Sequence, residues 1–228
     1  MNRPVPMPSA PLRLLVSCAF ALVLSMPPVD AAAQPETDPS PNAQLLVAAR
    51  TGQVARVKEL LAQGAIVDSR NRVGKTPLFI ACEKGNTELG IVLIEAKADV
   101  NLASVDHVTP LMAASYSGDA ELVKRLLAAG ARVDAVDRMN KSAPVYAAGQ
   151  GHATALEALL ASGLDVNATY EHQLTLLMWA AGQGHADAVR LLLSRGARPD
   201  MRDDRGMTAF DIARGAGQEA MAQSVGLH

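Results

Sequence analysis

The chain is poor in aromatic residues and has no excess of positive charge. Phe, Trp and Tyr make up 3% of its 228 residues, which favours thin layers of small apolar side chains over a core of large rings. The formal net charge of −2 provides no general electrostatic attraction to nucleic acid or to anionic lipid. We therefore expect no nucleic-acid partner, and no membrane partner unless the N-terminus anchors the chain.

Cysteine is scarce, because Cys18 and Cys82 are the two in the sequence. Removal of the N-terminal segment described next would leave Cys82 alone, which excludes an intramolecular disulfide and a cysteine-rich zinc site. Cys82 takes a position that holds alanine or serine in four other copies of a repeat described below. We therefore expect a small buried side chain there, with a redox or intermolecular role as the alternative.

Residues 1–33 have the features of a secretory signal peptide. Arg3 and Arg13 give a positively charged start, and an apolar run of 13 residues, 14–26, follows, which is shorter than the roughly 20 residues that a membrane-spanning helix needs. Ala31 and Ala33 fit the positions that a signal peptidase reads. We expect cleavage after Ala33 and a periplasmic or secreted protein. The alternatives are an uncleaved anchor or a lipid-modified Cys18, although the apolar stretch that follows Cys18 is unlike a lipoprotein.

Three rows of residues recur at a step of 33. The first row is Gly52, Gly85, Gly118, Gly151, Gly184 and Gly217. The second is Gly64, Lys97, Gly130, Gly163 and Gly196, and the third is Asp68, Asn101, Asp134, Asn167 and Asp200. A fixed period of this length indicates a stacked array of small units, which presents an extended surface rather than a single pocket.

Each unit carries the signals of two short helices. A threonine at the start of four units can cap the first helix with its hydroxyl, and in two of them a proline follows at the first helical position, where a missing N–H costs nothing. These threonines are Thr76, Thr109, Thr175 and Thr208. The fourth unit has Ser142-Ala143-Pro144 instead, which predicts a first helix that starts late. Lys97 stands in a row of glycines, which predicts a left-handed backbone there at a cost of about 1 kcal/mol.

These units resemble ankyrin repeats. The matching elements are Thr-Pro-Leu at 76–78 and 109–111, Ala-Ala in the first helix, and Gly-His at 151–152 and 184–185. The resemblance implies an all-α ankyrin-repeat solenoid of about five to six helix–turn–helix units joined by β-turn or loop fingers. It covers residues 42–228, after a disordered proline-rich linker at 34–41. The units run over 42–70, 71–103, 104–136, 137–169, 170–202 and 203–228. We expect the two end units to cap the array, and the first of them lacks the Thr-Pro start.

No set of residues points to catalysis, a cofactor or a metal ion. No two histidines stand at metal-ligand spacing on one helix, and no nucleophile lies in a recognisable catalytic turn. His152 and His185 fall where a side chain could cap the second helix of the repeat, while His107 and His172 lie in connecting loops. We therefore expect a protein that is not an enzyme and holds no cofactor.

The candidate functional positions lie on the surface that ankyrin repeats use, which is formed by the loop fingers and the exposed side of the first helix. Carried onto this chain, the candidate partner-binding residues are Arg72, Lys75, Lys84, Asp106, Tyr116, Arg138, Met139, Lys141, Tyr146, Glu171, His172, Trp179 and Arg205. Apolar residues recur at the finger tips, namely Val105, Met139, Leu174 and Met207. Tyr146 and Trp179 are 33 residues apart, so they either fill the layer of first helices or anchor a partner.

The charges along the fingers alternate in sign. This mosaic argues against a phosphate backbone, which favours a continuous basic stripe, and fits a protein partner. We therefore expect a monomeric, non-enzymatic scaffold that binds another protein through its concave face and fingers, in the bacterial periplasm. The alternatives are a membrane-tethered envelope component, or an accessory or inhibitor protein for an exported enzyme or toxin.

Overall fold

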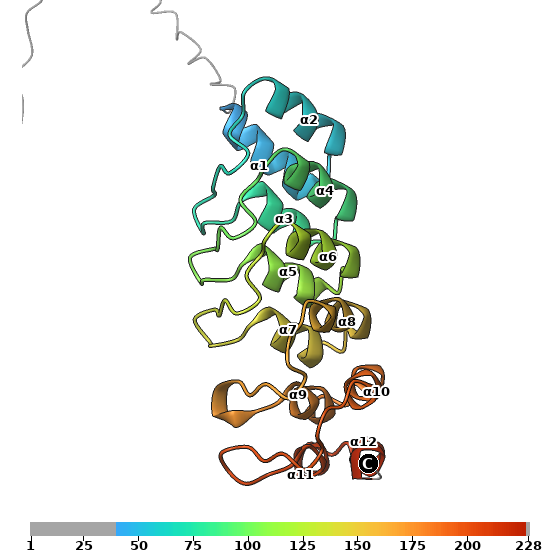
Figure 1. The fold of residues 1–228 in the computed structure, drawn as a ribbon. Coiled ribbons are helices and arrows are strands. Elements are labelled where there is room, and N and C mark those ends of the chain that lie inside the picture. The colour runs from blue at the N-terminus through green and yellow to red at the C-terminus, as the bar shows by residue number, and fades with distance from the viewer. Residues whose placement is uncertain (1–39, 227–228) are drawn as a thin grey trace, which may run out of the picture. The chain divides into compact units, whose positions relative to one another are not determined.

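The computed structural model describes residues 40–226, which form six pairs of α-helices (Figure 1). The first helices of the pairs are α1 (Pro41–Thr51), α3 (Pro77–Glu83), α5 (Pro110–Ser117), α7 (Ala143–Gly149), α9 (Leu176–Gly182) and α11 (Ala209–Gly215). The second helices are α2 (Val54–Ala62), α4 (Thr87–Glu95), α6 (Ala120–Ala128), α8 (Ala153–Ala161), α10 (Ala186–Ser194) and α12 (Glu219–Gly226). The expected all-α array is confirmed. The expected signal peptide and residues 34–39 of the expected linker lie outside the described residues.

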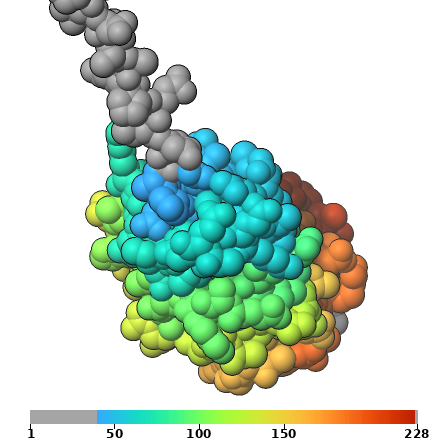
Figure 2. Space-filling model, turned by 90° about the horizontal axis from the view of Figure 1, so that it is seen from above, coloured from blue at the N-terminus to red at the C-terminus, as the bar shows by residue number. Residues whose placement is uncertain are grey.

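The helix pairs stack in two layers. First helices contact first helices along the whole series, from α1 on α3 to α9 on α11, and second helices do the same from α2 to α10 (Figure 1). A loop finger connects each pair to the next and projects on the side of the first helices (Figure 1). Viewed from the N-terminal end, the side chains of successive pairs meet without a break (Figure 2).

The core repeats with the sequence, because equivalent positions are buried between neighbouring pairs. One row comes from the second helices and comprises Leu60, Leu93, Leu126, Leu159, Leu192 and Val225, each at most 1% exposed. A row of small side chains comes from the first helices and comprises Ala48, Ala81, Ala114, Ala147, Ala180 and Ala213. Cys82 lies in the same layer and is fully buried, as expected for a small filler, and burial raises the pKa of its thiol.

Threonine hydroxyls begin four of the first helices, as predicted. Thr76 Oγ1 accepts the main-chain N–H of Phe79 at 3.1 Å, and the other three threonines make the equivalent bond. The caps matter because these helices have only seven or eight residues, fewer than the roughly 12 that an isolated helix needs in water.

Two helix starts differ from the sequence-based expectation. Helix α7 begins at Ala143, in register with the other first helices, so the predicted late start is wrong. Pro144 takes the second helical position, whose N–H also lacks a partner within the helix, and a proline there breaks no bond. The first unit does have a Ser-Pro start, three residues before the repeat register: Ser40 accepts the N–H of Ala43, and α1 begins at Pro41, inside the expected linker.

His152 and His185 do not cap their own helices as expected. They stand at the N-cap positions of α8 and α10, but Nε2 of His152 lies 2.9 Å from the main-chain oxygen of Tyr116, and Nε2 of His185 lies 3.0 Å from that of Gly149. Since a carbonyl only accepts, Nε2 carries the proton in both contacts. Each histidine therefore closes the end of the preceding unit's first helix. A Cβ on Gly151 would lie 2.6 Å from the His185 ring, so this contact also requires glycine.

Lys97 has the left-handed backbone predicted from its place in a row of glycines. Its φ is 66°, and the equivalent glycines in the two flanking units, Gly64 and Gly130, have φ values of 90° and 88°. A Cβ at either of these two glycines would have no atom within 4 Å, so only the backbone conformation favours glycine at this position.

We expect the substitution Lys97→Gly to raise the free energy of unfolding by about 1 kcal/mol, because it removes a Cβ from a left-handed residue. The thermal midpoint should rise by roughly 2–4 °C, measured by circular dichroism. The reverse change in the next unit, Gly130→Lys, is the matched control and should lower the midpoint. An unchanged or lower midpoint for Lys97→Gly would contradict the strain at this residue.

Candidate partner-binding surface

Three clefts lie in a row where the fingers meet the first helices. Their volumes are about 260, 210 and 180 Å³. Tyr116 and Tyr146 line both the first and the second cleft, and Trp179 and Gln183 line both the second and the third. The clefts are therefore neighbours, and together they form what we call the first-helix groove, which crosses α3, α5, α7, α9 and α11.

Aromatic rings from three successive units stand in the first-helix groove. Tyr116 is 53% exposed, and its ring meets the Tyr146 ring edge-on, with centroids 5.9 Å apart and planes at 81°. Tyr146 and Trp179 are both half-buried, so each contributes to packing and to the groove wall. The Tyr146 hydroxyl donates a short hydrogen bond to the buried Asp137, and its pKa is raised by burial first and then by that bond.

The fingers have a defined conformation, because one side chain closes most of them. Asn71 Oδ1 accepts the N–H groups of Val73 and Lys75, at 3.0 and 2.9 Å. Asp137 and Asp203 close the fingers of the fourth and sixth units in the same way, and each finger is numbered by the unit that it begins, from the second to the sixth. The fourth residue of each finger is left-handed, counted from Asn71 to Gly74 in the finger of the second unit. These residues are Gly74, His107, Asn140, Gln173 and Gly206.

Main-chain hydrogen bonds also join neighbouring fingers. Val105 N–H donates to the oxygen of Val73 at 3.1 Å, Arg138 N–H to Asp106 at 3.2 Å, and Asp204 N–H to His172 at 3.1 Å. The equivalent bond between the fourth and fifth fingers is missing from the described residues. Only side chains link these two fingers, by the bond of Asn140 Nδ2 to Glu171 Oε1 at 3.3 Å.

The fifth finger is built differently from the others. Tyr170 stands in place of the closing Asn or Asp, and a short 3₁₀ turn follows at Glu171–Gln173. His172 and Gln173 are both left-handed, with φ of 58° and 59°, and His172 Nδ1 contacts Asp204 Oδ2 at 2.9 Å. Burial, followed by the charge of Asp165, raises the pKa of Tyr170 to about 12. Two adjacent left-handed residues without glycine store strain in this finger.

The structure divides the candidate residues of the sequence into two groups. One group lines the first-helix groove and comprises Lys75, Asp106, Tyr116, Lys141, Tyr146, Trp179 and Arg205. The other lies outside it: Arg72, Arg138, Met139, Glu171 and His172 are exposed on the fingers, and Lys84 lines a separate depression beside Arg50. Sequence reasoning missed the groove floor, formed by Phe79, Met112, Met178 and Ile212, and its two glycines, Gly149 and Gly182.

Most charges in and beside the groove are paired. Lys75 lies 2.6 Å from Glu83, Arg138 lies 3.7 Å from Asp106, and Arg205 lies 2.7 Å from Asp203. These pairs break the positive charge of the fingers into separate spots. The arrangement can bind an extended or irregular surface but offers no continuous basic stripe.

The described residues hold no arrangement suited to metal chemistry or to membrane insertion. Within 40–226, no group of three His, Cys, Asp or Glu side chains could hold a metal ion. In the same range, no helix is both long and apolar enough to span a bilayer.

Comparison with known proteins identifies the repeat. The family model described as ankyrin repeats (three copies) matches residues 45–137 and 144–225. A mitochondrial disaggregase from Bos taurus is 43% identical over 63 residues, which is 28% of this chain and 9% of that protein. The mitochondrial disaggregase from Homo sapiens is 41% identical over 61 residues, 27% of this chain and 9% of that protein. The chain thus spans less than a tenth of these curated relatives.

We expect Tyr146→Phe to lower the free energy of unfolding by about 1–2 kcal/mol, because it removes a hydrogen bond to a buried carboxylate. Chemical denaturation followed by circular dichroism measures the change. Tyr116→Phe is the matched control, since its exposed hydroxyl has no partner in the described part of the chain, and should leave stability unchanged. Equal effects of the two substitutions would show that the Tyr146 hydroxyl does not stabilise the fourth finger.

Proposed function

The chain belongs to the ankyrin-repeat family, and from this premise we propose that it is a non-enzymatic scaffold that binds another protein through the first-helix groove and the fingers. We further propose that it acts in the bacterial periplasm, to which residues 1–33 direct it before their removal. Ankyrin repeats indicate a protein-interaction scaffold.

The observation that carries the proposal is the row of rings in the first-helix groove. Tyr116, Tyr146 and Trp179 come from three successive units and all stand partly open to solvent. Large aromatic side chains in such positions are the residue types that most often anchor a protein partner. A groove that runs across several units also suits an extended partner segment better than a small molecule held in one enclosed cavity.

The rigidity of the fingers supports the same proposal. Side-chain closure of the individual fingers and main-chain bonds between neighbours hold the fingers in place before any partner arrives. Preorganised loops lose less conformational entropy on binding, which favours affinity. The paired charges favour a protein with its own charge pattern over nucleic acid.

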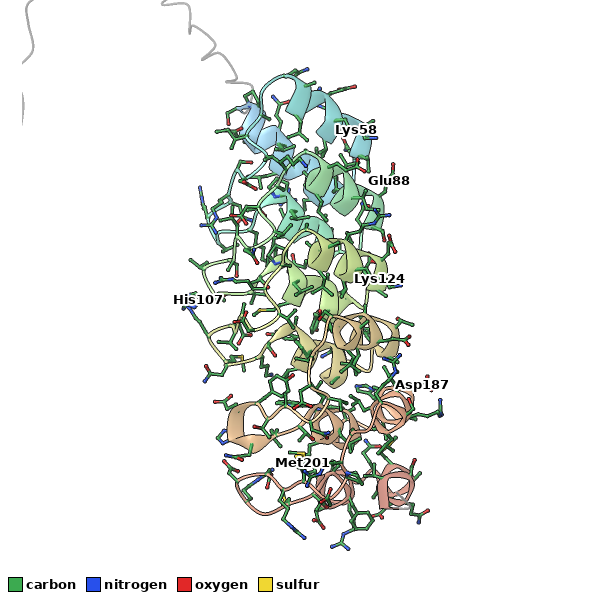
Figure 3. The ribbon with its side chains drawn as sticks, viewed as in Figure 1. Lys58, Glu88, His107, Lys124, Asp187 and Met201 are labelled. Carbon is green, nitrogen blue, oxygen red and sulfur yellow. The ribbon has the colours of Figure 1, made fainter. Side chains whose placement is uncertain are left out.

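We expect a double substitution in the groove, Tyr116→Ala with Trp179→Ala, to abolish recovery of the partner from envelope extracts of the native cells after chemical crosslinking. Tyr146 is left intact because it stabilises the fourth finger. The matched control is Lys58→Ala with Lys124→Ala on the second helices, which Figure 3 shows on the side away from the finger residue His107. Wild type and control should recover the same protein.

Circular dichroism must first show that the groove variant is folded. Equal recovery of the partner by a folded groove variant and by the control would contradict the proposed binding surface. A partner lost only in the control would place the site on the second helices instead.

We expect the mature protein to begin at Gln34. Intact-mass measurement of the chain purified from the periplasmic fraction of native cells checks this, because cleavage after Ala33 fixes the mass. A chain that retains residues 1–33, or a lipid-modified Cys18, would contradict the exported soluble form and favour a membrane-tethered component instead.

A further inference from the structure

One equivalent position of the repeat holds glycine in the last three units. The seventh residue after the cap of the first helix is Glu83, Tyr116, Gly149, Gly182 and Gly215 in successive units. Glu83 and Tyr116 line the first cleft of the groove, whereas Gly149 lines the second, between Tyr116 and Trp179. The second cleft therefore has aromatic walls and a glycine in its lining.

Packing against the next unit explains Gly182 but not Gly149, and a Cβ on the third glycine, Gly215 in the last unit, would have no atom within 4 Å. A Cβ on Gly182 would lie 2.9 Å from Ile212 Cγ2, so the neighbouring unit excludes a side chain there. A Cβ on Gly149 would lie 3.8 Å from Trp179 Cε3, which is an ordinary contact. Gly149 is helical, where glycine costs about 0.5–1 kcal/mol relative to alanine. The fold therefore does not require glycine at position 149, where the missing side chain leaves an open space beside Trp179.

The open space at Gly149 is bounded by three rings. Tyr116, Tyr146 and Trp179 line it together with the two glutamines Gln150 and Gln183. Its volume of about 210 Å³ equals the space of roughly seven water molecules, which is enough for an apolar side chain and part of a main chain. We call this second cleft the Gly149 slot.

Lys141 places a charge at the edge of the Gly149 slot, and its ammonium forms no ion pair within the described residues. Its ammonium lies over the Trp179 ring, 5.4 Å from the centroid, and it has no ion-pair partner among residues 40–226. The other cations that line the groove, Lys75 and Arg205, each have a carboxylate at 2.7 Å or less. The half-buried Lys141 is therefore available to an acidic group from outside.

From this geometry we infer that the Gly149 slot receives an extended segment of the partner protein in which an acidic residue adjoins an apolar one. The apolar side chain, such as proline, leucine or an aromatic, lies over Gly149 between the rings of Tyr116 and Trp179. The carboxylate pairs with Lys141. This inference rests on the proposed function and adds the chemistry of the partner.

The charges and walls of the slot favour this occupant over others. A basic residue beside the Lys141 ammonium would be repelled, and the nearby Lys75 and Arg205 are already paired. The Asp137 carboxylate is buried and accepts hydrogen bonds from the Met139 and Lys141 main chain and from the Tyr146 hydroxyl. A nucleic acid or an anionic lipid surface would need several unpaired cations in a row, which the groove does not offer. An acidic segment without an apolar residue would leave the three rings uncovered.

A library of random peptides displayed on phage tests the inference without knowledge of the natural partner. The purified chain beginning at Gln34 should enrich peptides in which Asp or Glu lies next to Pro, Leu or an aromatic residue. Lys141→Glu should enrich basic residues at the same place. It should also weaken a peptide selected on the wild type by about tenfold or more, measured by fluorescence anisotropy. Lys124→Glu makes the same charge change on the second helices and should not alter the affinity.

A second variant tests the slot independently of charge. Gly149→Leu should fill the slot and abolish binding of the selected peptide, while Gly149→Ala should leave the chain at least as stable as the wild type. Failure to enrich any peptide, enrichment without acidic residues, or an affinity that neither Lys141→Glu nor Gly149→Leu changes would each overturn the inference.

The same variants separate this inference from the proposed function. If peptides fail but recovery of the natural partner still depends on Tyr116 and Trp179, the partner uses the groove with a different chemistry and only the inference falls. If neither peptides nor the partner depend on these residues, the proposed function falls with it.

Discussion

The constraint on which the rest of the structure depends is that no single unit can bury its own apolar faces. Helices of seven to eleven residues are too short to persist alone, and the row from Leu60 to Val225 is buried only because each pair covers the next. The links outside the core follow the same rule. Nε2 of His152 reaches a carbonyl of the preceding unit, and Asn101 and Asn167 bond main-chain groups of the unit that follows. Stability is therefore a property of neighbouring units and not of any one of them.

Packing between units determines the side chain at some positions of the repeat and leaves others free to vary. The alanine row of the first helices cannot change much, because larger side chains would push the units apart. The residue before each of these alanines is more varied, and the set comprises Val47, Ile80, Ala113, Tyr146, Trp179 and Ile212. Ile80 and Ala113 are buried in the core, whereas Tyr146 and Trp179 are half-buried and line the groove. A different side chain in place of Tyr146 or Trp179 changes the wall of the groove, so this is where a binding specificity can be built.

The sequence predicts local features well and features that span units poorly. The threonine caps form between residues of one unit, and the left-handed backbone of Lys97 concerns one residue whose equivalents are glycines, and both appear in the structure as expected. The sequence predicts that His152 and His185 cap their own helices, whereas their partners in the structure are carbonyls of the preceding unit. Ser40 was missed because it lies outside the 33-residue register. The groove could not be read from one repeat, since each cleft is assembled from the fingers and helices of two or three units.

Departures from local stability gather at the junction of the fourth and fifth units. Three of the five buried polar atoms without a partner in the described residues belong there, on Ser142, Tyr170 and Trp179. The main-chain bond between fingers is missing at this junction, two residues in a row are left-handed, and a helical glycine faces an open slot. Each departure lowers the stability of the fold, and a different residue at the same place would avoid this loss. Such departures are found most often at the functional site of a protein. The junction also holds Lys141 and two of the three groove rings. Strain, unpaired groups and binding chemistry thus coincide at one place in an otherwise regular array.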